Sequence, residues 1–404
     1  MALPSTAPPG GAPAPPLQQR TAPRLGSIDL LRGAVIVLMA LDHVRYFVSD
    51  ARFDPTDPAR ATVALFFTRW VTHFCAPVFM FLAGLGAWLS LGRGRDVASL
   101  SRFLWTRGLW LVLLEVTFAR AAWQFNFDYG YTSALVLWAL GWCMVALAGL
   151  VRLRPESAGW TGVGMIVAHN MFDGLQAAEL GPLGPLWMIL HEPGTITLAP
   201  GVELFVLYPL VPWIGVMAAG YGFGPLFRRP PAERDRLCLR LGLGLTAAFV
   251  VLRLVNGYGD PAPWAVQATP WRTALSFLNT TKYPPSLQFL LMTLGPAIAL
   301  LPRLDCARGP LAGAVRTFGR VPLFFWLLHV PVIHLAAVAL SVGRYGAVIP
   351  WLVRNPPAAA PQGYGYSLAV VYAVTIAVVA ALYPVCRWFA GVKQRRRDGW
   401  LGYL

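Results

Sequence analysis

Arg32 and His43 lie on one apolar stretch and have residue types suited to binding an anion and moving a proton. If residues 28–45 are helical, the eleven steps between them make about three turns and about 16 Å of rise, so both share one face at opposite ends. Asp29 precedes Arg32 by about one turn and is placed to pair with it, and Asp42 directly precedes His43. Charge in an apolar run is costly in hydrocarbon and usually functional, so this stretch is the first candidate site.

Other ionisable residues fall inside apolar runs. The predicted helices bring His73 to about the depth of His43, so the two are candidates for one cavity. Glu115 is the only carboxylate that lies this deep in an apolar run. A carboxylate at such a depth must be protonated, paired with a base or exposed to water. The structural alternative for each histidine is an interhelical hydrogen bond that only holds the bundle together, and for Glu115 it is an ion pair with Arg120 or Arg107.

No metal site is expected from the spacing of potential ligands. His329 and His334 are five residues apart, which is not the i, i+4 spacing of a shared helical metal face. The five cysteines contain no CxxC pair and lie mostly in or beside apolar runs, as inert buried thiols do.

The composition is that of a polytopic membrane protein. Of the 404 residues, 56% are hydrophobic and 13% charged, with a mean hydropathy of +0.55, which is too apolar for an ordinary soluble domain. The net charge of +15 comes from basic clusters between apolar runs, a pattern typical of cytoplasmic loops and not of a nucleic-acid footprint. We therefore expect a bilayer, and no nucleic acid, as partner.

The predicted fold is all-α, a bundle of about ten membrane-spanning helices with both termini cytoplasmic, in a cell inner membrane. Residues 1–23 are predicted to be a disordered tail, residues 24–397 one domain, and residues 398–404 a C-terminal tail. Pro209 and Pro212 predict a kinked sixth helix. The expected spans are residues 28–48, 65–91, 103–125, 132–151, 160–180, 203–227, a seventh ending near 256, an eighth ending near 301, 321–342 and 368–385.

An ordered set of motifs resembles the transmembrane acyltransferase superfamily. This superfamily includes the acyltransferase-3 proteins and the heparan-alpha-glucosaminide N-acetyltransferase catalytic domain, and the resemblance is closest to the second branch. The resemblance covers nearly all of the chain after residue 23. The opening motif is Ser27-Ile28-Asp29-Leu30-Leu31-Arg32-Gly33 with Leu41-Asp42-His43. The supporting stretches are residues 66–79, 169–174, 208–213, 282–286 and 318–324.

The resemblance implies transfer of an acyl group, usually acetyl, from cytoplasmic acyl-CoA to a sugar, glycan or small-molecule acceptor at the outer face, with no metal. Arg32 and His43 match the spacing of the acyltransferase-3 arginine and histidine, but the other branch places its histidine further on. The residue that takes the proton, or that itself accepts the acetyl group as a nucleophile, is therefore open between His43 and His73. Asp42 and Glu115 are then expected to orient or charge-balance the base. The expected CoA-binding residues are Arg32, Asp29, Arg107 and Arg320, and the expected acceptor-binding residues are His169, Asn170, His191, Lys282 and His329.

Two other functions are compatible with the sequence. A proton-coupled transporter of an anionic or sugar-like solute would use the membrane histidines as a proton relay, although no internal repeat is visible. A structural partner in an envelope-polymer assembly would tolerate substitution at every membrane histidine. A homodimer is compatible with either function and with the acyltransferase.

Overall fold

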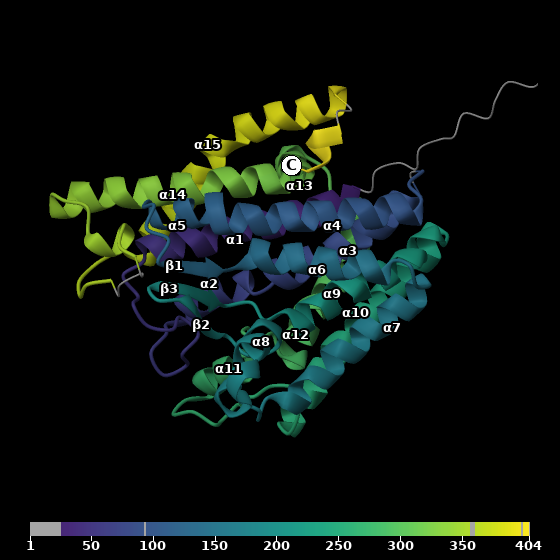
Figure 1. Cartoon of the computed structure of the whole chain (residues 1–404), viewed down its shortest axis with the longest axis horizontal. Helices are drawn as coiled ribbons and strands as arrows, with labels where there is room; N and C mark the ends of the chain where they lie inside the picture. Colours follow the sequence, from purple (N-terminus) through teal and green to yellow (C-terminus); the bar gives the residue numbers. More distant parts are fainter. Residues whose placement is uncertain (1–25, 93, 356–359, 397–398, 404) are drawn as a thin grey trace, which may run out of the picture.

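The computed structural model describes residues 26–92, 94–355, 360–396 and 399–403. The predicted N-terminal tail, residues 1–23, lies outside the described residues, as do residues 398 and 404 of the predicted C-terminal tail. The described chain is mostly helical, and the long helices form one bundle with the three strands at one of its ends (Figure 1).

Seven helical segments of the described chain are long and apolar enough to cross a membrane. Two of them contain breaks: α2 and α3 are separated at His73-Phe74, and α4 continues through a π-helical turn, Glu115–Ala119, into α5. The segments are Val63–Leu91 (α2, Val63–Thr72, and α3, Cys75–Leu91), Val97–Gln124 (α4, Val97–Leu114, and α5, Arg120–Gln124), Leu210–Arg228 (α9, Leu210–Phe223), Pro231–Val255 (α10), Leu287–Asp305 (α12), Pro322–Tyr345 (α14) and Leu368–Arg395 (α15).

The predicted number of ten spans is not confirmed and stays a prediction, as does the cytoplasmic position of the termini. Helix α1 (Gly26–Val48) is long enough but carries four charged residues, and α6 (Val136–Leu150) and α7 (Pro155–Ala168) are shorter than the seven. The predicted fifth span, residues 160–180, is wrong as one helix, because the chain leaves α7 in a 3-10 turn at His169–Phe172. The other helices are α8 (Gly184–Leu190), α11 (Pro270–Leu278) and α13 (Pro310–Arg320).

A three-stranded sheet corrects the prediction of an all-α fold. Strand β3 (Val202–Val206) lies between β1 (Tyr131–Ala134), with which it is parallel, and β2 (Gly194–Ala199), with which it is antiparallel. Strands β1 and β3 are each followed within a few residues by an apolar helix. In the sequence, each strand and the helix after it therefore form one continuous hydrophobic segment. Ala134, Ile196, Leu204 and Val206 form the small core of the sheet.

Pro209 and Pro212 start a helix and do not kink one. Pro209 is the residue before α9 and Pro212 lies in its first turn, where a missing N–H costs no helical hydrogen bond. The predicted kink is therefore wrong.

Helix α1 is the central element of the fold. It packs against α2, α3, α12, α13, α14 and α15, while α4 pairs with α6, α7 with α9, and α10 with α12. The helix that carries Arg32 and His43 is therefore enclosed by the elements that supply the rest of the site.

Helix α1 approaches the backbone of α13 closely at Gly33. A Cβ atom added at Gly33 would lie 1.9 Å from the carbonyl oxygen of Val315. We expect Gly33→Ala to force α1 and α13 apart and to destabilise the protein by about 1–3 kcal/mol, the usual cost of overpacking. Thermal unfolding in detergent measures it against Gly343→Ala, since a Cβ at Gly343 meets nothing within 4 Å. Equal midpoints for the two variants would contradict the prediction.

Candidate active site

One cavity of about 710 Å³ runs alongside α1 and holds most of the predicted catalytic residues. Its volume is in the range of small-molecule sites. Arg32 and Arg107 line one part, here called the arginine end, and His43 lies about 16 Å along the helix from Arg32, in the part called the histidine end. The lining residues used below are Arg32, Asp42, His43, Arg45, Arg69, Arg107, Glu115, Tyr208, Lys282 and Tyr283.

The arginine end is held by carboxylate and carbonyl groups. Asp29 lies 3.6 Å from Arg32 and 3.9 Å from Arg320, and Arg32 donates to the carbonyl of Gly319 at 3.4 Å. Asp29 and Arg320 themselves lie outside the cavity lining. Of the four predicted CoA-binding residues, Arg32 and Arg107 line the cavity, and the ion pair with Asp29 holds Arg32 in place.

Arg107 meets the C-terminal segment at the same end. Its guanidinium donates to the carbonyl of Gly402, and the hydroxyls of Thr106 and Tyr403 are hydrogen-bonded at 2.8 Å. Leu401 is buried beside them. Residues 401–403 therefore pack against α4 beside Arg107.

Asp42 joins two arginines at the histidine end. Its Oδ1 accepts from Arg45 at 3.0 Å, and its Oδ2 accepts from Arg69 at 2.5 Å. Arg69 comes from α2, so this carboxylate links α2 to α1. Both oxygens are engaged by arginines and not by His43, and the prediction that Asp42 orients the base stays untested.

His43 is paired with His329 of α14. His43 Nδ1 and His329 Nε2 are 2.8 Å apart, and His329 Nδ1 lies 2.8 Å from the carbonyl of Trp326 and 3.1 Å from that of Phe325. Carbonyl oxygens only accept, so the hydrogen of a neutral His329 sits on Nδ1 and its Nε2 accepts from His43 Nδ1. Nε2 of His43 then keeps its lone pair, which is the state of a general base. His329 is placed to fix this tautomer, and its role in binding the acceptor stays a prediction.

Glu115 is buried, and its Oε2 accepts from the backbone N–H groups of Leu137 at 2.7 Å and Trp138 at 3.1 Å. These amides open α6, where a negative charge is favoured by the helix dipole. The alternative of an ion pair with Arg120 or Arg107 is wrong, because those side chains donate to backbone carbonyls. Glu115 lines the cavity and holds one wall in place, while a direct role toward the base stays a prediction.

Lys282 and Tyr283 reach the histidine end from the loop before α12. Asp260 holds this loop by accepting from Thr281 N–H at 2.9 Å and Ser286 O–H at 2.6 Å. Burial alone would raise the pKa of Tyr283, but the cations Lys282 and Arg69 outweigh it and hold the pKa below its usual value. The Tyr283 hydroxyl is therefore suited to exchange a proton at this end.

His73 stands apart from the cavity. It is buried at the break between α2 and α3, its ring lies 5.4 Å from that of Phe289, and its Nδ1 has no hydrogen-bond partner among the described residues. Of the two predicted bases, His43 is the one that lines the cavity.

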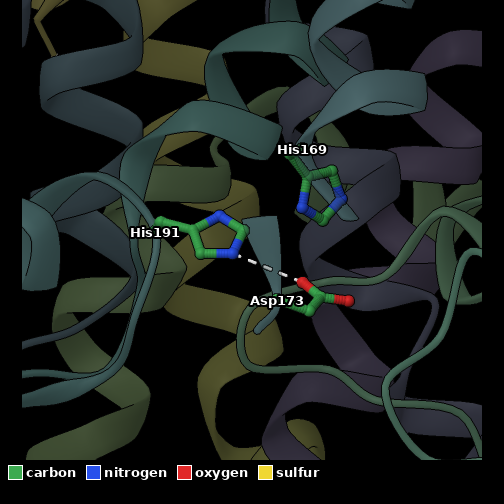
Figure 2. Close-up of side chains that lie close together, drawn as sticks. All are labelled: His169, Asp173 and His191. Carbon is green, nitrogen blue, oxygen red and sulfur yellow. Dashed lines mark ion pairs between the residues drawn. The ribbon is translucent and has the colours of Figure 1, made fainter. Parts of the chain in front are cut away.

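Two predicted acceptor-binding residues, His169 and His191, lie together with Asp173 in a second cluster (Figure 2). A third, Asn170, belongs to the same cluster, because its Nδ2 donates to Asp173 Oδ2. All four lie outside the cavity lining. Asn170 links this cluster to the start of α12, because its Oδ1 accepts a hydrogen bond from the backbone N–H of Leu287. Leu287 comes directly after the loop that carries Lys282 into the cavity.

Sequence reasoning missed Arg69, Tyr283 and Tyr208 as site residues. Arg69 is a charge inside a predicted span, the same signal that identified Arg32. The Tyr208 and Tyr283 hydroxyls lie 3.3 Å apart, and both residues belong to motif stretches of the resemblance, but tyrosine in a membrane protein carries no sequence signal of its own.

Comparison with known proteins identifies a family. A family model described as heparan-alpha-glucosaminide N-acetyltransferase, catalytic, matches residues 24–252, which is more than half of the chain and extends from α1 into α10. A comparison with curated proteins finds no significant match. The matched region contains Arg32, His43 and Arg69, whereas Lys282 and His329 lie beyond it. This chain belongs to the heparan-alpha-glucosaminide N-acetyltransferase catalytic-domain family.

Proposed function

We propose that this protein is a multi-pass membrane acetyltransferase that takes acetyl from acetyl-CoA on the cytoplasmic side and passes it to an amine or hydroxyl of a sugar or glycan at the outer face. The observation that carries the proposal is that Arg32 and Arg107 share a cavity with a histidine whose tautomer leaves Nε2 ready to accept a proton.

The arginine end suits the donor. Coenzyme A carries several phosphate charges, and guanidinium groups bind phosphate through paired N–H donors. With its phosphates near Arg32 and Arg107, the thioester arm extends along α1 toward His43. The apolar cavity walls match an arm that is largely uncharged.

His43 acts as general base in this proposal. The acceptor nitrogen or oxygen attacks the thioester carbonyl carbon, a new C–N or C–O bond forms, and the C–S bond breaks. Nε2 of His43 takes the proton from the attacking group and passes it to the leaving thiolate, so free coenzyme A thiol is the second product. His329 holds the required tautomer through its hydrogen bond to His43 Nδ1.

The histidine end suits an acceptor with hydroxyl or acidic groups. Arg45, Arg69 and Lys282 face one carboxylate, Asp42, so positive charge is in excess there. The Tyr283 hydroxyl adds a polar group that donates or accepts. Sugars and acidic glycans offer the matching oxygen atoms.

Purified protein in proteoliposomes tests the function. Acetyl-CoA does not cross the bilayer, so it is supplied inside, outside or on both sides, with glucosamine and other amino sugars as acceptors. We expect thiol release to require both donor and acceptor, with the donor on one side only, and we expect acetylated acceptor to be found by mass spectrometry.

Two results would overturn the proposal. One is failure of acetyl-CoA to bind the folded protein at all. The other is proton-coupled uptake of a sugar without coenzyme A, which is what the transporter alternative predicts.

A further inference from the structure

We propose that His169, Asp173 and His191 form a zinc site. The proposal is independent of acetyl transfer, because the three residues lie outside the cavity. His169 follows the last residue of α7, Asp173 follows the 3-10 turn His169–Phe172, and His191 follows α8.

The donor atoms converge on one point. Figure 2 shows both imidazole rings turned toward the carboxylate, and the donor atoms of the three residues all lie within 4.8 Å of one another. His191 Nε2 and Asp173 Oδ1 are 3.3 Å apart. Two ligands bound at about 2.0–2.2 Å in a tetrahedral site stand about 3.4 Å apart, so this edge already has the required length. The edges to His169 are at most 4.8 Å, so an inward movement of His169 of up to about 1.4 Å completes the set.

His169 supplies an independent reason to expect a ligand. The residue is only 2% exposed, yet neither of its ring nitrogens makes a hydrogen bond of ordinary geometry to any part of the chain that the structure describes. A buried polar atom without a partner is costly, and a metal ion at one nitrogen removes that cost. The backbone carbonyl of Pro285 interacts with the ring and is placed to accept a hydrogen bond from the N–H of the nitrogen that does not bind the metal.

The carboxylate has an outer partner of the kind that orients metal ligands. Asn170 Nδ2 donates to Asp173 Oδ2 at 2.8 Å, which leaves Oδ1 directed at His191. Outer-shell hydrogen bonds of this type are a regular feature of metal sites. Asp173, Asn170 and the backbone N–H of Leu287 thus form one chain of contacts.

Zinc fits this donor set better than magnesium or calcium does. Two imidazoles and one carboxylate are typical zinc ligands, whereas magnesium and calcium prefer oxygen alone. Three protein ligands leave a fourth position for water, and the Asp173 side chain, 19% exposed, gives that position access to solvent.

The position of the site indicates a structural role. The three ligands join the end of α7 to the end of α8, and Asn170 ties this segment to the start of α12. The loop immediately before α12 carries Lys282 and Tyr283 into the cavity. Zinc would therefore fix the segment against which this loop is seated.

The test uses the full chain, purified in detergent with an affinity tag that contains no histidine. After chelator treatment and dialysis, zinc is added back without acetyl-CoA, and metal content and thermal unfolding are measured. We expect about one zinc ion per chain and a higher unfolding midpoint with zinc. His169→Gln and Asp173→Asn should lose both effects.

The matched control is His334→Gln, which also removes a buried membrane histidine but lies away from the cluster and should retain zinc. Zinc uptake that is absent in the wild type, or equal in His169→Gln and the wild type, would overturn the proposal. If the cluster variants do not fold, X-ray absorption of the zinc-loaded wild type decides, because any ligand set other than two imidazoles with oxygen donors contradicts the site.

Discussion

Replacing His43 with alanine is expected to lower the rate of acetyl transfer by about 10²- to 10⁴-fold, the usual contribution of a general base. The variant loses Nε2, the proton acceptor, and leaves His329 without its 2.8 Å partner. Arg32 and Arg107 are unchanged, so acetyl-CoA affinity should remain close to that of the wild type. Initial rates of thiol release, measured alongside equilibrium binding of acetyl-CoA, separate the two quantities.

His334→Gln is the matched control for this prediction. His334 lies on α14 like His329, is fully buried, and faces the Ala122 carbonyl at 2.9 Å outside the cavity. We expect it to retain the activity of the wild type. Equal rates for His43→Ala and the wild type would refute the assignment of the base, and His73→Ala would then be the variant to measure.

Asp42→Asn is expected to lower the free energy of unfolding by about 3 kcal/mol, because removing one partner of a buried pair leaves the other charge uncompensated. The carboxylate meets Arg45 and Arg69, and the three side chains are only 12–18% exposed. An amide at this position leaves two cations side by side in the protein. Unfolding in mixed detergent micelles measures the change.

The comparison variant is Glu233→Gln, which breaks the pair between Glu233 and Arg229. Those side chains are 45% and 54% exposed, and exposed pairs contribute little. A loss of stability in Asp42→Asn no larger than in Glu233→Gln would show that the two arginines are neutralised by other groups.

The arrangement along α1 could be predicted from sequence because it depends only on helical geometry. The rise per residue places Arg32 and His43 about 16 Å apart on one face, and both do line one cavity. The partner of His43 could not be predicted in this way, since His329 is 286 residues away and its pairing depends on how α14 packs against α1.

Local patterns also misled where tertiary contacts decide the structure. Glu115 reads as an isolated carboxylate that needs a cation, but the start of α6 supplies two backbone amides instead. Likewise, His169 and His191 belong to separate segments of the sequence and come together only because the chain turns after α7. The relation to acyltransferase-3 proteins, the outer-face direction of transfer and the choice of membrane stay predictions.

The bond between His43 and His329 also has a consequence for biosynthesis. At a ribosomal rate of 5–20 residues per second, the 286 residues between the two histidines take roughly 15–60 s to synthesise. During that time α1 is already made, but the tautomer of His43 is not yet set. A nascent chain therefore lacks the hydrogen bond between His43 and His329 until α14 has been synthesised and packed against α1.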